Sequence, residues 1–379
     1  MNLLICAGAG DFNHGGVERY LIDRLLRMNT DDFDITLVVP GIVRAKDWIE
    51  ELERGINCRF RVEELNCFSY GRLYRLLGSK LKIRKIISSR SFDLIHINSG
   101  ALWWQVAALA EAKRAGIPNR LSHSHSASFG AARKASFADR ALRRIVNACA
   151  TEKLACSDVA GCWLFGEDSW NNGGHILRNA INTEVYRYDE EIRTTVRGKD
   201  NGCYIVGCVA RLYDYKNVQF LVETLPYILD INPNAKLWII GDGPQRKALE
   251  ARIASLDIES RVVLFGARSD VHRLMQGMDV LVLPSKYEGF GLVVLEGQAA
   301  GLPCVVSDQV PNDVDVVADA VQHCSLLADR HEWAKVIAGC IGYRNRDGWL
   351  DVIQAGFDIN SAAKELENVY RECSKESSK

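Results

Sequence analysis

The sequence predicts an α/β protein built from two doubly wound domains, each a parallel sheet covered by helices on both faces. Two observations carry this prediction. Short apolar runs alternate with amphipathic stretches along the whole chain, an order typical of parallel sheets. At 379 residues the chain is also too long for one ordinary core. The candidate strands fall into a group before about residue 160 and a group after about residue 203, so two sheets are expected.

The candidate strands are largely apolar runs of six or seven residues. Those of the first half are 2–8, 34–40, 92–98, 119–125 and 153–158. Those of the second half are 204–210, 235–241, 261–266, 280–285 and 303–308. Stretches such as 17–28 and 270–278 have the pattern of amphipathic helices. Ligands bind at the carboxyl ends of parallel strands, so two facing sheets would place the chemistry in a cleft between them.

The segment 182–202 is polar and has no strong period, so it is predicted to join the two domains. We therefore expect a first domain over 1–181 and a second over 182–356. Composition is that of a soluble globular protein, with 47% hydrophobic and 25% charged residues and a net charge of −1. The twelve cysteines form no CxxC pair and no zinc-spaced cluster with histidine, which favours core thiols in a reducing compartment. We expect no secretion signal and no membrane span, because no apolar run approaches ~18 residues.

Charge is distributed unevenly along the chain. Residues 1–150 hold 23 Lys and Arg against 15 Asp and Glu, whereas the remainder holds 24 against 33. In 68–90 and 131–144 the cations are interleaved with aromatic and aliphatic residues, a composition typical of helices that rest on an anionic bilayer. The alternative is a pair of solvated amphipathic helices. Nucleic acid is disfavoured, because these cations do not surround a recognisable binding module.

The first candidate strand runs into a glycine loop, "CAGAGDFNHGGVE". A dinucleotide fingerprint needs G-x-G-x-x-G and an acidic residue about 20 positions later. The spacing here is different, and the second strand ends "VVPG" without an acid, so a nicotinamide cofactor is disfavoured. The pair Gly15 and Gly16 stands directly before a predicted helix, where backbone N–H groups attract an anion. A tight turn without a ligand is the alternative.

Two cations follow the first candidate strand of the second half, in "ARLYDYKN". Arg211 and Lys216 at the carboxyl end of a strand can clamp a diphosphate, or they can be ordinary solvated surface charges. The next strand ends in "IIGDGP", a common connection from strand to helix that contains Gly241 and Gly243.

The stretch "PSKYEGFGLVVLE" carries Glu288 and Glu296 on either side of seven residues. Its glycines predict a helix that opens near Gly291, so the backbone donors of 290–292 could meet a phosphate or a sugar. A carboxylate can accept hydrogen bonds from two adjacent hydroxyls of a sugar or ribose. The alternative is one acid in a loop and another exposed on a helix.

Together these motifs resemble the family 4 retaining glycosyltransferases. "EGFGLVVLE" matches the E-x7-E motif of that family, and "GGVE", "ARLYDYKN" and "IIGDGP" occur in the family's order. The similarity covers essentially the whole chain. "HSHS", "RNAINTEVY" and "AAGLPCVVSD" are similar to bacterial enzymes that build capsule, exopolysaccharide or O-antigen chains.

The resemblance implies a GT-B fold, in which two Rossmann-like domains face a cleft and no metal ion or other cofactor is needed. The second domain would hold a nucleotide-sugar, with UDP the favoured nucleotide, and the first would bind the acceptor. A C-terminal helix over about 357–379 would pack back onto the first domain. The implied reaction is retaining transfer of a hexose or N-acetylhexosamine to a lipid-linked oligosaccharide or saccharide, in the cytoplasm at the inner face of the membrane.

By position, the resemblance assigns catalytic roles to Arg211 and Lys216, which would neutralise the donor diphosphate, and to Glu288, which would contact the donor sugar. It also implies a histidine at the end of the fourth strand, where His125 is favoured over His123. The donor-binding residues that it implies are Glu296 on the ribose, the backbone of Phe290, Gly291 and Leu292, the glycines Gly15, Gly16, Gly241 and Gly243, and Arg268 near the base.

Two rival functions share this scaffold. One is a sugar-nucleotide epimerase or a phosphorylase, although a phosphorylase would need a lysine pocket for pyridoxal phosphate that the sequence does not locate. The other is a non-catalytic module that binds sugar nucleotides. Retention by two carboxylates would need a nucleophile on the far face of the sugar, and the sequence offers no clear candidate. A same-face route, in which the departing phosphate takes the acceptor proton, is favoured.

Overall fold

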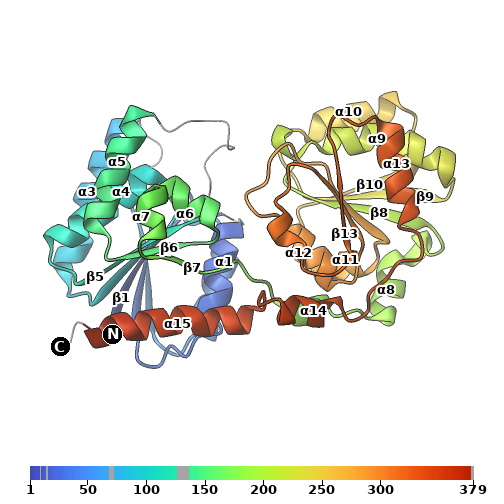
Figure 1. Cartoon of the computed structure of the whole chain (residues 1–379). Helices are drawn as coiled ribbons and strands as arrows, with labels where there is room; N and C mark the ends of the chain where they lie inside the picture. Colours follow the sequence, from blue (N-terminus) through green and yellow to red (C-terminus); the bar gives the residue numbers. More distant parts are fainter. Residues whose placement is uncertain (9, 14–15, 68–71, 126–135, 377–379) are drawn as a thin grey trace. The chain divides into compact units, whose positions relative to one another are not determined.

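The computed structural model describes residues 1–8, 10–13, 16–67, 72–125 and 136–376. The chain divides into two compact units. Unit 1 comprises Met1–Ala180 and Ile359–Lys379, and unit 2 comprises Ile181–Asp358. Each unit has a wholly parallel sheet with helices on both faces (Figure 1). The predicted fold class of two doubly wound domains is therefore confirmed.

The sheet of unit 1 has seven strands in the order β3-β2-β1-β4-β5-β6-β7. Their bounds are β1 Asn2–Ala7, β2 Asp34–Val39, β3 Arg59–Glu64, β4 Leu94–Asn98, β5 Asn119–Ser124, β6 Glu152–Ala155 and β7 Gly174–Ile176. The chain order reverses at β1, which pairs with both β2 and β4. Such a reversal point is where ligands of doubly wound sheets bind.

Alternation along β1 explains how both faces of this sheet are covered. Leu3 and Ile5 enter a core with the helices α1, α2 and α15, whereas Leu4 and Cys6 enter a second core with α3, α4 and α5. A buried parallel strand reads as a continuous apolar run because successive side chains serve opposite faces. The helices of unit 1 are α1 Gly16–Leu25, α2 Lys46–Gly55, α3 Arg72–Ser89, α4 Leu102–Arg114, α5 Phe137–Cys149, α6 Asp158–Phe165, α7 Glu167–Asn171 and α15 Ile359–Glu376.

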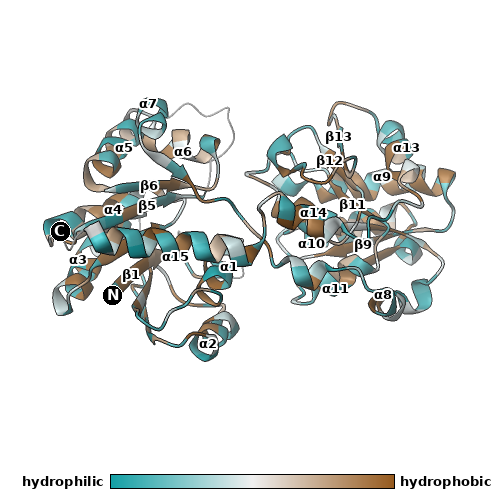
Figure 2. Ribbon diagram, turned by 60° about the horizontal axis from the view of Figure 1, so that its bottom comes forward, coloured by the Kyte–Doolittle hydropathy of each residue, from teal (hydrophilic) through white to brown (hydrophobic). Residues whose placement is uncertain are grey.

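The C-terminal helix α15 belongs to unit 1, where it lies beside α1 (Figure 1). Leu366 and Tyr370 are fully buried in the same core as Ile5. Much of the rest of α15 is hydrophilic, while the strands of both units are largely hydrophobic (Figure 2). An apolar stripe on a polar helix therefore anchors the end of the chain to the first sheet.

The sheet of unit 2 has six strands in the order β10-β9-β8-β11-β12-β13. Their bounds are β8 Tyr204–Val209, β9 Ala235–Ile240, β10 Val262–Gly266, β11 Val280–Leu283, β12 Cys304–Ser307 and β13 Val321–Cys324. One face carries α9 Val218–Ile231, α10 Arg246–Ser255 and α13 Arg330–Gly339. The other face carries α8 Glu190–Arg197, α11 Val271–Gln276, α12 Leu292–Ala299 and α14 Gly348–Gln354 (Figure 1).

Three strands were absent from the sequence prediction, and all three lie at sheet edges. β3 reads RFRVEE and has both ends exposed, β7 has three residues, and β13 reads VQHC. An edge strand is covered less than a central one, so polar residues interrupt the apolar run that signals a strand. The segment 182–202 also holds more structure than predicted. It contains α8, whose Arg193 and Arg197 both pair with Asp279 in unit 2.

Candidate functional site

Lys216 and Glu288 come from segments far apart in the sequence and meet at the carboxyl ends of β8 and β11. Lys216 lies in the short turn that follows β8, and its Nζ contacts the carboxylate of Glu288. Ser285 Oγ donates to the same carboxylate oxygen at 2.8 Å. The two charged side chains are only 16% and 9% exposed. The structure thus unites two of the predicted catalytic residues in one partly buried ion pair.

Arg211 follows the end of β8 and has an exposed side chain. It donates to the hydroxyl of Tyr215 at 3.0 Å, and its guanidinium carbon lies 5.3 Å from the ring centroid of Tyr213. Among the described residues Arg211 makes no ion pair. Its positive charge is held by two tyrosines and is not neutralised by a neighbouring carboxylate, an arrangement that suits an incoming anion.

The helix α12 begins immediately after Gly291, as predicted. Gly291 has a φ of +91°, which only glycine adopts without strain, and its carbonyl accepts from the N–H of Val294 at 2.8 Å. Phe290 is buried and packs on Phe357. Glu296 is half-buried in the second turn of α12. α12 therefore begins a few residues after Glu288, and both lie in or after the connection that leaves the carboxyl end of β11.

Gly241 and Gly243 have a packing role that can be seen directly. A Cβ on Gly241 would lie 2.0 Å from the carbonyl oxygen of Ala210, and one on Gly243 would lie 2.6 Å from that of Leu212. The backbone of Leu212 donates to Asp242 at 3.0 Å. The Gly-Asp-Gly turn thus presses against the segment that carries Arg211, and this close approach requires glycine.

The remaining predicted donor residues are placed as follows. Arg268 forms a bidentate pair with Asp270 in the loop after β10, with both N···O distances at 2.7 Å. Gly16 is the first residue of α1. Gly15 lies outside the described residues. No contact joins Arg268 to the Lys216–Glu288 pair among the residues that the structure describes.

In unit 1 both candidate histidines lie at the carboxyl end of β5, within a buried polar cluster. His123 Nδ1 lies 3.2 Å from Nε2 of His96 on β4, and His96 Nδ1 lies 2.7 Å from the hydroxyl of Tyr370 on α15. The rings of His123 and His125 are 4.1 Å apart. Arg24 of α1 is fully buried nearby, with its guanidinium over the ring of Tyr20 at 3.5 Å.

These histidines are held neutral. Burial, together with the positive charge of Arg24, lowers the pKa of His96 to about 3. Burial, together with His96 and Arg24, lowers the pKa of His125 to about 3 as well. Burial, followed by the neighbouring His125 and His96, lowers the pKa of His123 well below its usual range. At physiological pH the imidazoles of this cluster are therefore uncharged, and they donate and accept hydrogen bonds as neutral rings.

The sequence analysis named only His123 and His125 of this cluster, and two of the residues that it missed contact His125 directly. Asn98, the last residue of β4, lies with Oδ1 2.6 Å from Nε2 of His125. The Tyr20 ring meets His125 edge-on at 4.6 Å. A polar residue at the end of the candidate strand 92–98 was a usable signal for Asn98, because carboxyl ends of neighbouring parallel strands meet at one edge. Tyr20 carries no such signal in a helix pattern.

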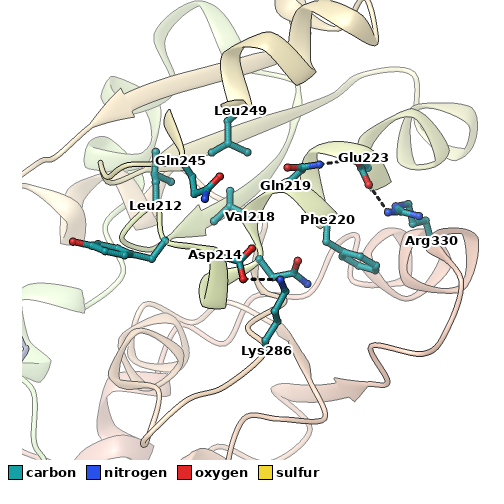
Figure 3. A pocket seen from close by; sticks show the side chains of 12 residues that line it. Leu212, Asp214, Val218, Gln219, Phe220, Glu223, Gln245, Leu249, Lys286 and Arg330 are labelled. Atoms are coloured by element: carbon teal, nitrogen blue, oxygen red, sulfur yellow. Dashed lines mark hydrogen bonds and ion pairs between the residues drawn. The ribbon is translucent and has the colours of Figure 1, made fainter. Parts of the chain in front are cut away.

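A separate cavity of about 280 Å³ opens beside the segment that follows β8 (Figure 3). Ion pairs between Asp214 and Lys286 and between Glu223 and Arg330 cross its wall (Figure 3). Apolar side chains, including Val218 and Leu249, also line it. None of the predicted site residues lines this cavity, but Tyr213, which packs against Arg211, does.

Metal and membrane features were sought over the same described ranges. They contain no group of three or more His, Cys, Asp or Glu residues that could hold a metal ion. None of the helices within them is both long and apolar enough to cross a bilayer.

Two family models match the chain. Residues 14–159 match the model described as Glycosyltransferase Family 4, and residues 189–341 match the model described as Glycosyl transferases group 1. These matches correspond to the first and second sheets, respectively.

Individual proteins give a consistent result. The candidate glycosyltransferase EpsF of Bacillus subtilis (strain 168) is 33% identical over 295 residues, which is 74% of each chain. The UDP-Gal:alpha-D-GlcNAc-diphosphoundecaprenol alpha-1,3-galactosyltransferase of Escherichia coli is 24% identical over 77% of this chain and 76% of its own. The crystal structure of Anabaena HepE in complex with UDP-glucose superposes with a TM-score of 0.78 at 19% identity, covering 98% of this chain and all of that one.

Proposed function

Because the chain belongs to the family 4 glycosyltransferases, we propose that it moves a sugar from a nucleotide-sugar donor to a saccharide acceptor with retention of the anomeric configuration. The favoured donor is a UDP-sugar carrying a hexose or an N-acetylhexosamine. The favoured acceptor is a lipid-linked oligosaccharide used in cell-surface polysaccharide synthesis.

The contact between Lys216 and Glu288 carries this proposal. It joins the "ARLYDYKN" and "EGFG" motifs at one edge of the second sheet, a few residues before α12 begins. An ammonium has three N–H donors, so Lys216 can keep Glu288 and still donate to a phosphate oxygen. Arg211 supplies a second positive charge from the end of β8.

The chemistry at this edge would be electrostatic. Cleavage of the anomeric C–O bond leaves an oxocarbenium-like sugar and a diphosphate with growing negative charge. Arg211, Lys216 and the free N–H groups at the start of α12 would stabilise that charge. The departing phosphate would then take the acceptor proton on the same face of the sugar, so no enzyme nucleophile is required. This route needs no metal ion, because the two cations serve the diphosphate.

The choice of UDP and of a lipid-linked acceptor follows from the relatives. The E. coli relative is named for transfer from UDP-Gal to GlcNAc-diphosphoundecaprenol, and Anabaena HepE was crystallised with UDP-glucose. The substrates in these names are those of the two relatives. For this chain we propose the same classes of donor and acceptor, but not the individual sugar.

Residues 68–90 and 131–144 form the proposed contact with an anionic membrane at the cytoplasmic face. Within the described part, Leu77 and Leu81 stand one turn apart on α3 and are 50% and 62% exposed. Exposed Lys82 and Lys85 follow on the same helix. Residues 68–71 and 131–135 lie outside the described residues. Apolar side chains flanked by cations suit the boundary between acyl chains and anionic headgroups.

Flotation with vesicles rich in phosphatidylglycerol tests this contact. The Leu77→Ser/Leu81→Ser variant is expected to bind on the order of tenfold less than the wild type, because two leucines no longer enter the bilayer. Leu327→Ser is the matched control, since Leu327 is 97% exposed in unit 2. If the wild type does not bind these vesicles at low salt, the proposed membrane contact is contradicted.

A two-step experiment tests the function itself. A thermal-shift screen of UDP-, GDP- and dTDP-sugars identifies the donor, since a ligand raises the melting temperature by mass action. That donor is then incubated with a GlcNAc-diphosphopolyprenol, and the new glycosidic bond is characterised by NMR. Transfer with the anomeric configuration of the donor is expected. Isomerised donor without transfer would indicate the epimerase, and binding without any turnover would indicate the non-catalytic module.

A further inference from the structure

Asn98 occupies a fully buried position beside His125. It ends β4 and lies opposite His123 of β5 in the sheet register. Its side-chain oxygen lies 2.6 Å from Nε2 of His125, within the normal range of a short hydrogen bond. The two residues are 27 positions apart in the sequence and meet only because their strands are neighbours.

The hydrogen bond determines where the proton of His125 resides. With Oδ1 of Asn98 turned to the ring and its Nδ2 left without a partner among the described residues, the amide oxygen accepts, and this orientation assigns the proton to Nε2. A neutral imidazole has one ring proton, which leaves Nδ1 as an acceptor with a free lone pair. Within the described residues no hydrogen-bond partner reaches Nδ1, and His125 is only partly buried.

Two rings hold the imidazole in this orientation. Tyr20 packs edge-on against it with ring centroids at 4.6 Å, and His123 packs on it with centroids at 4.1 Å. Tyr20 is 3% exposed and His123 is fully buried, so neither ring can swing aside without disturbing the core. The contacts therefore restrict rotation of the side chain, while Asn98 selects its protonation.

The charges around His125 disfavour the imidazolium. The titratable and charged groups that face its cluster are Tyr20 and Arg24 from α1, His96 from β4, His123 from β5, Cys156 after β6, and Glu365 and Tyr370 from α15. Arg24 is a buried cation, and no carboxylate contacts His125 among the described residues. A carboxylate in place of Asn98 would stabilise the protonated ring, whereas a neutral amide does not.

We propose that Asn98 is a positioning residue that holds His125 as the neutral Nε2–H tautomer, so that Nδ1 accepts a hydrogen bond from a substrate hydroxyl. The inference rests on the proposed function for the role of His125 in catalysis. It adds a specificity: this position recognises a hydroxyl and rejects a phosphate or carboxylate, whose lone pairs repel that of Nδ1.

The tautomer can be measured without any substrate. Two-bond ¹H–¹⁵N correlation spectra of ¹⁵N-histidine-labelled full-length protein at pH 7 distinguish the three forms of the ring, and the spectrum of His125→Gln assigns the signal. The Nε2–H tautomer is expected. An Nδ1–H tautomer or an imidazolium at His125 overturns the proposal.

Variants then separate positioning from general stability. Asn98→Asp keeps the acceptor and is expected to raise the pKa of His125, so that a new acidic limb appears in the pH profile of kcat/KM. Asn98→Ala removes the acceptor, and we expect both tautomers to appear and kcat/KM for donor hydrolysis to fall on the order of tenfold. Ser122→Ala is the matched control, because it removes one buried hydrogen bond to Gln105 from the opposite face of β5.

The outcomes distinguish this inference from the proposed function. If Asn98→Ala and Ser122→Ala have equal effects on kcat/KM and neither alters the tautomer, Asn98 has only a structural role and the inference fails. If Asn98 does control the tautomer but His125→Gln retains full transfer activity, the positioning is correct and the catalytic assignment of His125 is wrong.

Discussion

In both units of this protein, polar side chains gather at the carboxyl ends of parallel strands. Those of unit 2 are charged, whereas the histidines of unit 1 are neutral. In unit 2 the ends of β8 and β11 bring together an ammonium, a carboxylate and an exposed guanidinium on loops. In unit 1 the ends of β4 and β5 bring together histidines that burial keeps neutral, next to Asn98.

On the proposed function, topology selects the location of each site and the side-chain environment selects its ligand. Arg211 is exposed on its loop, whereas the ammonium of Lys216 is only 16% exposed and is paired with the carboxylate of Glu288. A histidine buried beside a cation loses its charge and becomes a neutral hydrogen-bonding group. A diphosphate suits the first edge, and hydroxyls suit the second.

Removing the cation of unit 2 is expected to have the largest effect. Lys216→Ala should lower kcat for donor hydrolysis and for sugar transfer by about 10²- to 10³-fold, because one stabilising donor is lost from the growing charge of the diphosphate. Steady-state assays with the donor found by thermal shift measure this.

Lys286→Ala is the matched control for that variant. Lys286 lies in the same loop as Glu288, but it pairs with the exposed Asp214 and is itself 47% exposed. Its removal should leave kcat within about twofold, since exposed ion pairs contribute little. Near-normal turnover by Lys216→Ala, or equal losses in both variants, would contradict the assignment of Lys216.

Removing the histidine of unit 1 is expected to have the next largest effect. His125→Ala should lower kcat/KM about 10²-fold, a typical loss when a positioned proton acceptor is removed. The wild type should show no acidic limb from this histidine between pH 5 and 8, because its pKa of about 3 keeps it neutral throughout. A limb near pH 6.5 that disappears in His125→Ala would show that the ring is charged and would refute the contrast between the units.

The neutral cluster should also make stability sensitive to acid. A histidine with a pKa of about 3 when folded and about 6.5 when unfolded takes up a proton only on unfolding, so stability falls as pH falls from 6.5 towards 3. Urea titrations at pH 6 and pH 5 should show that His96→Gln reduces this loss by about 1 kcal/mol. An unchanged pH dependence in His96→Gln would mean that His96 titrates normally in the folded protein.

Arg268→Ala is expected to have the smallest effect. Arg268 already forms a bidentate pair with Asp270 and is 44% exposed, so the melting temperature should change little. Donor affinity, measured by calorimetry, should weaken by about threefold or less. A loss as large as that of Lys216→Ala would move the principal anion contact from the end of β8 to the loop after β10.

Central strands were predictable from sequence, whereas three of the four edge strands were not; the fourth, β10, carries an apolar run and was predicted. The apolar runs of β8 and β11 are uninterrupted, because both faces of those strands are buried. β3 and β13 are half-exposed and carry charged or polar residues, so they lack the pattern. The family model matches confirm the resemblance that the motifs had indicated.

The candidate site divides in a similar way. Sequence motifs located Lys216 and Glu288, and the contact between them could be anticipated because both follow strand ends. The partnership of Asn98 with His125 depends on the register between β4 and β5 and on the side-chain rotamers, which local sequence does not encode. The close approach of Gly241 to Ala210 likewise became evident only from packing.

The most direct test of the diphosphate site is calorimetric titration with whichever of UDP, GDP and dTDP gives the largest thermal shift. The wild type is compared with an Arg211→Ala/Lys216→Ala variant of equal melting temperature. Binding that is at least tenfold weaker in the variant is expected, because both positive charges at the end of β8 are gone. Equal affinities would show that the diphosphate is held elsewhere and would contradict the central claim.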